Sequence, residues 1–172
     1  MRPPYVSAPV AASPAPTQSR RARRMKRAGL LGLAGVAGAA WMMSVSACSK
    51  PVEISLSTVG NTMAYSTSAL TVHAGQTVHL TLKNAATDPT MSHNWALVRP
   101  GTQASVEAEA QKAGEAAGFI PLVADVLAHT PQVKPGQTGD VTFPAPPPGT
   151  YPYLCTNPGH AQSMKGVLTV AP

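Results

Sequence analysis

Alternating apolar and polar positions recur in several short stretches of the chain after residue 50. In the first six residues of VEISLSTVG (52–60) every second side chain is apolar, a period of two that predicts a half-buried β-strand. Residues 68–85 repeat this pattern on both sides of a turn at 74–76 and predict two more strands. Four further strands are predicted at 93–98, 139–143, 150–155 and 166–170. Short strands joined by turns rich in Gly and Pro predict an all-β sandwich or barrel.

One segment departs from the strand pattern. SVEAEAQKAGEAAG (105–118) is rich in Ala, Glu, Gln and Lys, and it predicts a helix of about three turns. Ser105 is the expected N-cap, and Glu107 is expected in the first turn. The stretch from the helix to His129 is expected to be irregular. We therefore expect a short helix inserted into the sandwich, and not a second domain.

The N-terminal region has the order of a secretory signal. Basic residues crowd into RRARRMKR (20–27), an apolar run follows at 28–43, and small residues lead to Cys48. The run of 16 residues is shorter than the roughly 20 that a membrane-spanning helix needs. An uncleaved N-terminal anchor is the alternative. Under either interpretation the domain that follows is exported. The pair Arg23-Arg24 leaves open whether the export signal is of the twin-arginine type.

These features divide the chain into three parts. Residues 1–24 are a low-complexity, Pro/Ala-rich extension that cannot bury a core, and translation starting at Met25 would remove them. Residues 25–47 are the predicted signal peptide, and residues 48–172 are one domain, long enough for a single core.

The positive charge of the chain belongs to its N-terminal region. The formal net charge is +6, but seven of the thirteen basic residues precede residue 28 and all seven acidic residues follow residue 50. From Cys48 onward, six basic residues face seven acidic ones, a formal charge of −1. The predicted domain therefore lacks the basic surface that nucleic-acid binding requires, and we expect no nucleic acid as a partner.

Two cysteines occur in the chain, and they have different surroundings. The stretch Val45-Ser46-Ala47-Cys48 resembles the lipobox of bacterial lipoproteins, in which the cysteine after the cleavage site is acylated. This implies a lipid-anchored protein in the periplasm or cell envelope, attached to the bilayer through Cys48. Cys155 is then the only thiol of an exported domain, where an unprotected thiol would oxidise.

The stretch YLCTNPGHAQSMKG (153–166) brings three unusual side chains together. Cys155, His160 and Met164 have the spacing C-x4-H-x3-M between two predicted strands. A thiolate, an imidazole and a thioether suit a soft metal, and two His, one Cys and a weak axial Met form the blue-copper arrangement. A second histidine from elsewhere would complete the set.

The four remaining histidines differ as candidates for that position. His93 begins an apolar strand directly after a loop, where its side chain can point into a site at one end of the sandwich. His79 faces away from the apolar side of its strand, and His73 precedes a turn, so both are expected to be solvated. His129 is a weaker alternative to His93.

Three segments resemble the azurin and auracyanin group of cupredoxins: MSHNWALV (91–98), VLAHTPQVKPGQTGDVTF (126–143) and YLCTNPGHAQSMKGVLTV (153–170). The resemblance implies an eight-stranded Greek-key β-sandwich that binds one type 1 copper ion. It implies His93, Cys155 and His160 as equatorial ligands and Met164 as the axial ligand. It further implies supporting roles for the neighbours of these ligands, which are Asn94, Thr156 and Asn157.

Three features differ from the azurin pattern. Ser92 stands where azurins have glycine, which affects a distant axial interaction of its backbone carbonyl with the metal. Asn157 occupies a position that is usually apolar, so we expect a shifted reduction potential. The azurin disulfide has no cysteine pair to form it.

The resemblance implies one-electron transfer between redox partners, such as a c-type cytochrome or a membrane electron-transfer complex. A copper-binding lipoprotein for storage or delivery is the alternative. We expect no enzymatic activity, because copper oxidases need further histidine-rich sites and this chain has no H-x-H pair. A metal-free immunoglobulin-type module, suggested by Tyr153-Leu154-Cys155, fits poorly because Trp95 is misplaced for that pattern.

Overall fold

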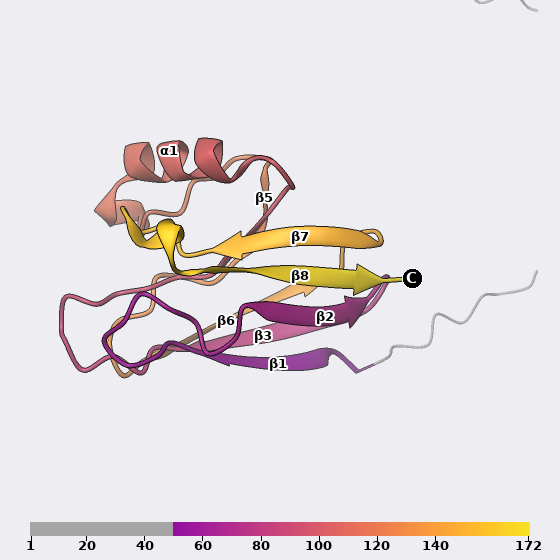
Figure 1. The fold of residues 1–172 in the computed structure, drawn as a ribbon, viewed down its shortest axis with the longest axis horizontal. Helices are drawn as coiled ribbons and strands as arrows, with labels where there is room; N and C mark the ends of the chain where they lie inside the picture. Colours follow the sequence, from indigo (N-terminus) through magenta and orange to yellow (C-terminus); the bar gives the residue numbers. More distant parts are fainter. Residues whose placement is uncertain (1–49) are drawn as a thin grey trace, which may run out of the picture. The chain divides into compact units, whose positions relative to one another are not determined.

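The computed structural model describes residues 50–172, which form a β-sandwich of two sheets (Figure 1). The predicted extension 1–24, the signal peptide 25–47 and Cys48 lie outside the described residues. The strands are β1 (Val52–Ser57), β2 (Ala69–His73), β3 (Thr77–Lys83), β4 (Ala96–Val98), β5 (Val126–His129), β6 (Thr138–Pro144), β7 (Gly149–Leu154) and β8 (Lys165–Ala171). One sheet has the order β1-β3-β6 and the other β2-β8-β7-β4-β5, so the predicted all-β sandwich is confirmed.

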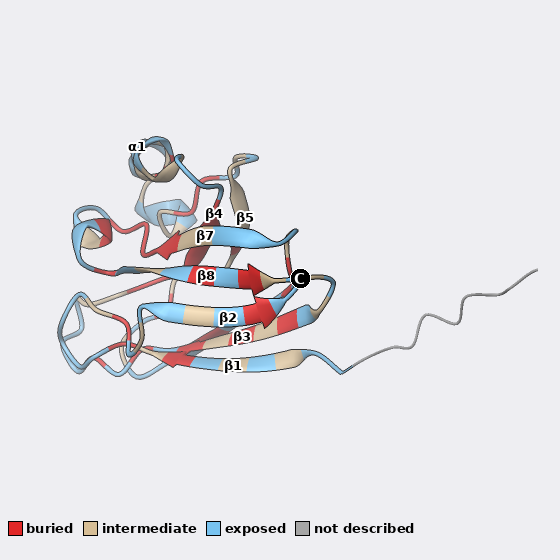
Figure 2. Cartoon of the chain, turned by 45° about the vertical axis from the view of Figure 1, so that its right-hand side comes forward, coloured by how far each residue is buried: buried red, intermediate tan, exposed pale blue. Residues whose placement is uncertain are grey.

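The period-two pattern places one face of each strand in the core. In β3, Val78, Leu80 and Leu82 are fully buried, while His79 and Thr81 lie on the outer side of the sheet. Opposite them, Leu168 and Val170 of β8 face inward, and Figure 2 shows buried segments alternating with exposed ones along this strand. Each such side chain contributes about 1.5–3 kcal/mol by leaving water, so these contacts hold the two sheets together.

One strand was missed by the sequence analysis. The stretch before His129, expected to be irregular, contains β5, which pairs antiparallel with β4 at the edge of the larger sheet. Residues 126–129 read VLAH, too short to show a period, and only Ala128 of the four is buried. The strand therefore forms because β4 is available as a partner, which is a tertiary effect.

The inserted helix is present, but its predicted limits were wrong. Helix α1 spans Gln103–Ala113, and a 3-10 turn at Glu115–Ala117 follows it. The N-cap is Thr102, not Ser105, and the first turn contains no acidic residue, so Glu107 lies further along the helix. Gly114, with φ of 73°, separates the two helical pieces.

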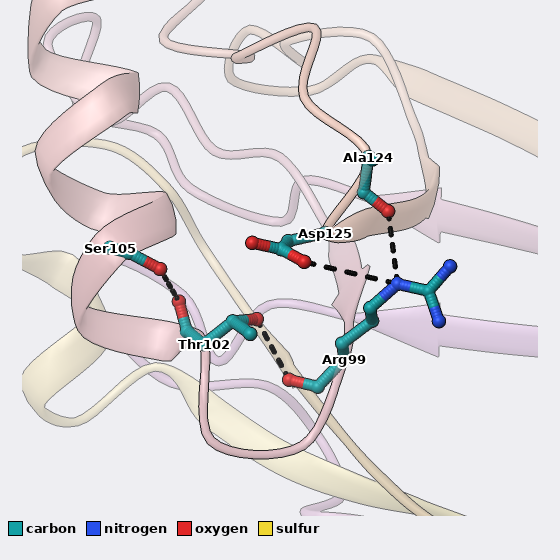
Figure 3. A network of polar contacts seen from close by, with 5 residues as sticks. All are labelled: Arg99, Thr102, Ser105, Ala124 and Asp125. Atoms are coloured by element: carbon teal, nitrogen blue, oxygen red, sulfur yellow. Dashed lines mark hydrogen bonds and ion pairs between the residues drawn. The ribbon is translucent and has the colours of Figure 1, made fainter.

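Hydrogen bonds surround the start of α1, although the Thr102 side chain itself caps no helix N–H group (Figure 3). The Thr102 hydroxyl donates to the Arg99 carbonyl at 2.8 Å, and the Ser105 hydroxyl donates to the Thr102 carbonyl at 2.8 Å. Arg99 Nε donates to the Ala124 carbonyl at 3.2 Å and lies 3.8 Å from Asp125 Oδ1. These contacts fix the base of the helix to the segment that leads into β5.

Helix α1 covers part of the outer face of the larger sheet. Its buried residues, Val106 and Ala110, face the sheet, and Val106 packs with Ala96, Val98 and Leu154 in a cluster separate from the main core. The helix side of β4 is buried in this cluster, and Leu97, on the other side of the strand, is buried in the main core. All three residues of β4 are therefore buried.

Among residues 50–172, no helix is long and apolar enough to cross a bilayer.

Candidate metal centre

Three of the predicted ligands meet at one end of the sandwich. Cys155 directly follows β7, His160 begins a 3-10 turn (His160–Gln162), and His93 lies on the chain between β3 and β4. The Cys155 Sγ lies 3.5 Å from Nδ1 of His160 and 4.0 Å from Nδ1 of His93. The two Nδ1 atoms lie 3.2 Å apart.

These separations fit a single bound ion. Three donors placed about 2.1 Å from one metal in a trigonal plane would stand ~3.6 Å from one another. The observed distances of 3.2, 3.5 and 4.0 Å bracket that value. A sulfur and two imidazole nitrogens, with no carboxylate in the group, are a donor set suited to copper.

Met164 lies beside this cluster and is fully buried. Its carbonyl accepts the Cys155 N–H at 3.0 Å, and its own N–H donates to the His160 carbonyl at 2.8 Å. The backbone of the predicted axial residue is thus hydrogen-bonded to the two ligands of its own loop.

The loop reverses direction through a tight turn. Gly159 has φ of 79°, a left-handed conformation that a residue with a Cβ rarely adopts. The His160 N–H then donates to the Asn157 carbonyl at 3.0 Å, and the Ser163 N–H donates to the His160 carbonyl at 3.1 Å. The Pro-Gly pair at 158–159 and these hydrogen bonds therefore fix the backbone of His160.

His93 is fixed by its backbone outside any strand. The predicted strand at 93–98 begins only at Ala96, and His93 instead forms an isolated bridge with Val133. The two residues exchange N–H···O bonds of 3.0 and 2.6 Å. The ring of His93 is fully buried, and its Nε2 has no hydrogen-bond partner among the described residues.

Asn94 connects the two ligand-bearing segments. Its Oδ1 accepts the Thr156 N–H at 2.8 Å, and its Nδ2 donates to the Thr156 hydroxyl at 2.8 Å. Asn94 is fully buried, and the Tyr65 hydroxyl donates to its carbonyl at 2.6 Å. The residue after His93 therefore holds the residue after Cys155.

The end of the helical insertion also contacts these segments, which the sequence analysis missed. Asn94 Nδ2 donates to the Gly118 carbonyl at 3.0 Å, and the Thr156 hydroxyl donates to the Phe119 carbonyl. Phe119 has φ of 54°, a rare conformation for a residue other than glycine. No local sequence pattern predicts these contacts, because they join residues far apart in the chain.

Burial controls the protonation of the ligands. Burial, and secondarily the neighbouring His160, lowers the pKa of His93 to about 4, and burial also lowers the pKa of His160. Burial raises the pKa of the Cys155 thiol to about 11. Both rings are therefore neutral and able to coordinate at neutral pH, while the thiol keeps its proton until a metal displaces it.

The other described histidines lie away from the cluster. His79 Nδ1 lies 2.7 Å from Glu53 Oε2, and Nδ1 of the exposed His73 lies 3.1 Å from the Pro172 carbonyl. His129 Nδ1 lies 3.1 Å from the carbonyl of Thr130. Of the candidates weighed for the second histidine, His93 alone joins Cys155 and His160.

The two positions that differ from the azurin pattern lie against each other. Asn157 is buried, and its Nδ2 donates to the Ser92 carbonyl at 2.6 Å. The carbonyl that was expected as a distant axial ligand therefore already accepts a hydrogen bond.

Comparisons with known proteins agree with this geometry. A family model described as copper binding proteins, plastocyanin/azurin family, matches residues 52–171. Auracyanin-A of Chloroflexus aurantiacus is 39% identical over 125 residues, which cover 71% of this chain and 76% of the relative. Azurin iso-2 of Methylomonas sp. (strain J) is 33% identical over 118 residues, which cover 64% of this chain and 92% of the relative.

Solved structures give the same result. The dithionite-reduced auracyanin of Roseiflexus castenholzii is similar with a TM-score of 0.66 and 39% identity, over 72% of this chain and all of that one. The structure of auracyanin A of Chloroflexus aurantiacus, described as a "blue" copper protein, has the same TM-score and identity over 70% of this chain and 99% of that one. With His93, Cys155 and His160 positioned to bind a single copper ion, this chain belongs to the plastocyanin/azurin family of copper-binding proteins.

Proposed function

We propose that this protein is a type 1 (blue) copper protein that transfers single electrons between redox partners outside the cytoplasm. The observation that carries the proposal is the buried, convergent group of Cys155, His93 and His160, with Met164 beside it. When bound, copper supplies a one-electron couple between Cu(I) and Cu(II). The chain supplies the ligands and holds their positions.

Rigidity of the ligand set supports electron transfer. A site that keeps one geometry in both oxidation states loses little energy to rearrangement when the electron moves. Here the segment carrying His93 is hydrogen-bonded to Val133, and the segment carrying Cys155 is hydrogen-bonded to Asn94. Gly159 and the turn after it fix His160 in the same manner. Hydrogen bonds of the chain therefore fix the segments that carry all three ligands.

The surroundings of His160 support an entry point for the electron. His93 is fully buried, but His160 is only half-buried, so its ring lies nearer the surface. Exposed uncharged residues accompany it, including Met63, Pro158 and Gln162. The Ser163 hydroxyl donates to the Met63 carbonyl at 3.0 Å, which joins the Met63 loop to the ligand loop. A c-type cytochrome or a membrane electron-transfer complex would dock on this surface.

The same donor set argues against an enzyme. A thiolate and two imidazoles with an axial thioether leave no open position for a substrate or a reactive water. Oxidases that contain such a centre need further copper ions to reduce their substrate. Residues 50–172 contain one cluster of three or more potential ligand side chains, namely His93, Cys155 and His160.

We further propose export and lipid anchoring through acylated Cys48. Only residues 49–51 separate that cysteine from β1, whose first residue is Val52. In Figure 1 β1 begins at the end of the sandwich opposite the loop between β7 and β8, which carries His160. A bilayer at the start of β1 would leave the copper end facing away from it. Several acyl chains on one cysteine would hold the protein stably.

Electron transfer is tested by cycling the copper-loaded protein. Repeated reduction and reoxidation by a c-type cytochrome, in the presence of an external Cu(I) chelator, should leave the copper in place and the absorption intact. Loss of copper to the chelator within the first cycles would reject electron transfer. That outcome would identify the alternative, a lipoprotein that stores or delivers copper.

A further inference from the structure

The two ligand-bearing segments are joined twice, and the second connection involves Asn157. The first connection runs from Asn94 to Thr156. In the second connection the side chain comes from the segment that carries Cys155, because Asn157 Nδ2 donates to the Ser92 carbonyl at 2.6 Å. Asn157 is only 8% exposed, so water cannot readily replace this bond.

A second hydrogen bond fixes the orientation of the Asn157 amide. Its Oδ1 accepts a hydrogen bond from Gln132 Nε2 at 3.4 Å. Reversing the amide would place its oxygen against the Ser92 carbonyl and its NH2 group against the NH2 group of Gln132. Both contacts would then be repulsive, so the N–H group must face Ser92.

The Ser92 carbonyl is an oxygen donor next to a metal ligand. It belongs to the residue before His93, and in a site of two nitrogens and two sulfurs it would add a harder ligand. Oxygen donors favour divalent ions over Cu(I), whereas thiolate and thioether sulfur favour Cu(I). A carbonyl that already accepts a short hydrogen bond is held in place and is a weaker donor to a metal.

We infer that Asn157 withholds the Ser92 carbonyl from the metal, and so makes the site selective for copper and favours its reduced state. This inference rests on the copper site, but not on electron transfer. Asn157 is a positioning residue here, because it acts through Ser92 and not as a ligand.

A cleft beside Asn157 determines which substitution is suitable for the test. A cleft of about 480 Å³ lies on this side of the site, lined by Ser92, Phe119, Gln132 and Asn157 among others. A small side chain at position 157 would admit water from the cleft, and that water could donate to Ser92 in place of the amide. Asn157→Leu removes the donor while keeping the same number and branching of side-chain heavy atoms.

The test measures metal preference and reduction potential in the purified full-length protein. In Asn157→Leu the freed carbonyl should raise the affinity for Co²⁺ relative to Cu(I) by about tenfold. This is the lower end of the change in metal affinity that follows the loss of a residue hydrogen-bonded around a metal site. The reduction potential should fall, because an oxygen donor stabilises Cu(II) more than Cu(I). The cobalt absorption spectrum provides a readout that requires no redox partner.

A control separates this effect from a simple loss of polarity. Gln162→Leu makes the same kind of change on the exposed part of the ligand loop. It should leave both the metal preference and the potential as in the parent protein. Loss of polarity at a buried position beside the metal would by itself raise the potential, because it disfavours the more highly charged Cu(II). The sign of the change in Asn157→Leu therefore distinguishes the two explanations.

A second variant covers the case in which Asn157→Leu does not fold. Gln132→Leu leaves Asn157 in place but removes the partner that orients its amide, and a partial shift in the same directions should follow. Unchanged metal preference, or a raised potential, in the variants would overturn the inference while the parent remains a blue copper protein. A parent protein that binds no copper would overturn the proposed function and this inference together.

Discussion

Asn94 is a single buried residue on which both ligand segments depend. Replacing it with Ala removes its bonds to Thr156 and Gly118 and leaves buried groups without partners. We expect Asn94→Ala to lower the free energy of unfolding by roughly 2–3 kcal/mol. Copper should also leave the variant faster in the presence of a chelator. Chemical denaturation and chelator-exchange kinetics measure the two effects.

Asn61 provides a matched comparison for that substitution. It also joins two loops, since its Oδ1 accepts the N–H groups of Thr87 and Asp88 at 2.7 and 3.0 Å, but it is exposed. Water can replace these bonds, so Asn61→Ala should cost about 1 kcal/mol or less. Equal losses of stability in the two variants would show that Asn94 has no special structural role.

His79 makes stability depend on pH on the outer face of the smaller sheet. A hydrogen bond to Glu53 of β1, with Asp140 of β6 further off at 3.6 Å, raises the pKa of His79 above its usual value. The charged ring therefore stabilises the fold below the usual histidine pKa of about 6.5, and this contribution is lost as pH rises through the higher folded-state pKa.

We expect the melting temperature of His79→Gln to fall further below that of the parent at about pH 5.5 than at about pH 8.5. Other titrating groups are shared by the two proteins and cancel in the difference. Thermal melts at both pH values measure it. A gap of the same size at both values would contradict the assignment.

At the residue scale, spacing in the sequence predicted most of the metal centre. Cys155, His160 and Met164 lie within ten positions, so one loop brings them together. His93 was found because it follows a loop and begins an apolar stretch. The contacts of Asn94 with Gly118, and of Asn157 with Ser92, could not be foreseen, because they depend on how distant segments pack.

At the scale of elements, β8 begins immediately after the ligand loop and needs a small residue there. Gly166 pairs with Tyr153 of β7, and a Cβ at this position would meet the Tyr153 ring and lie 2.5 Å from the Ser68 carbonyl. We expect Gly166→Ala to lower the free energy of unfolding by about 1–3 kcal/mol, because the ring or the strand must move.

Thr169→Ala is the control for that substitution, since Thr169 is exposed on the same strand. It should change stability by no more than about 0.5 kcal/mol. Denaturation of both variants gives the comparison. A Gly166→Ala protein as stable as the parent would show that the packing of Tyr153 against β8 tolerates the additional methyl group.

The elements that the sequence predicted well are those with a clear internal period. The pattern of β3 specified both the strand and its buried face, which the structure confirms. The missed strand β5 has only four residues and forms by pairing with β4. The helix limits were wrong because no side-chain cap marks the start of the helix at Thr102 and Gly114, with φ of 73°, ends it early.

At the scale of the whole molecule, the proposed anchor sets the orientation of the copper end. Cys48→Ala should prevent acylation and release the protein from the membrane into the soluble fraction. Fractionation of cells that express the parent and the variant, followed by immunodetection, measures this. A variant that stays with the membrane would contradict anchoring through Cys48 and favour an uncleaved N-terminal segment.

The central claim is that Cys155 binds copper in a type 1 centre, and the visible and EPR spectra of the Cu(II)-loaded protein test it most directly. We predict an intense thiolate-to-copper absorption band and a narrow copper hyperfine splitting, both of them lost in Cys155→Ser. A protein that is colourless with Cu(II), or whose absorption band survives in Cys155→Ser, would contradict the account.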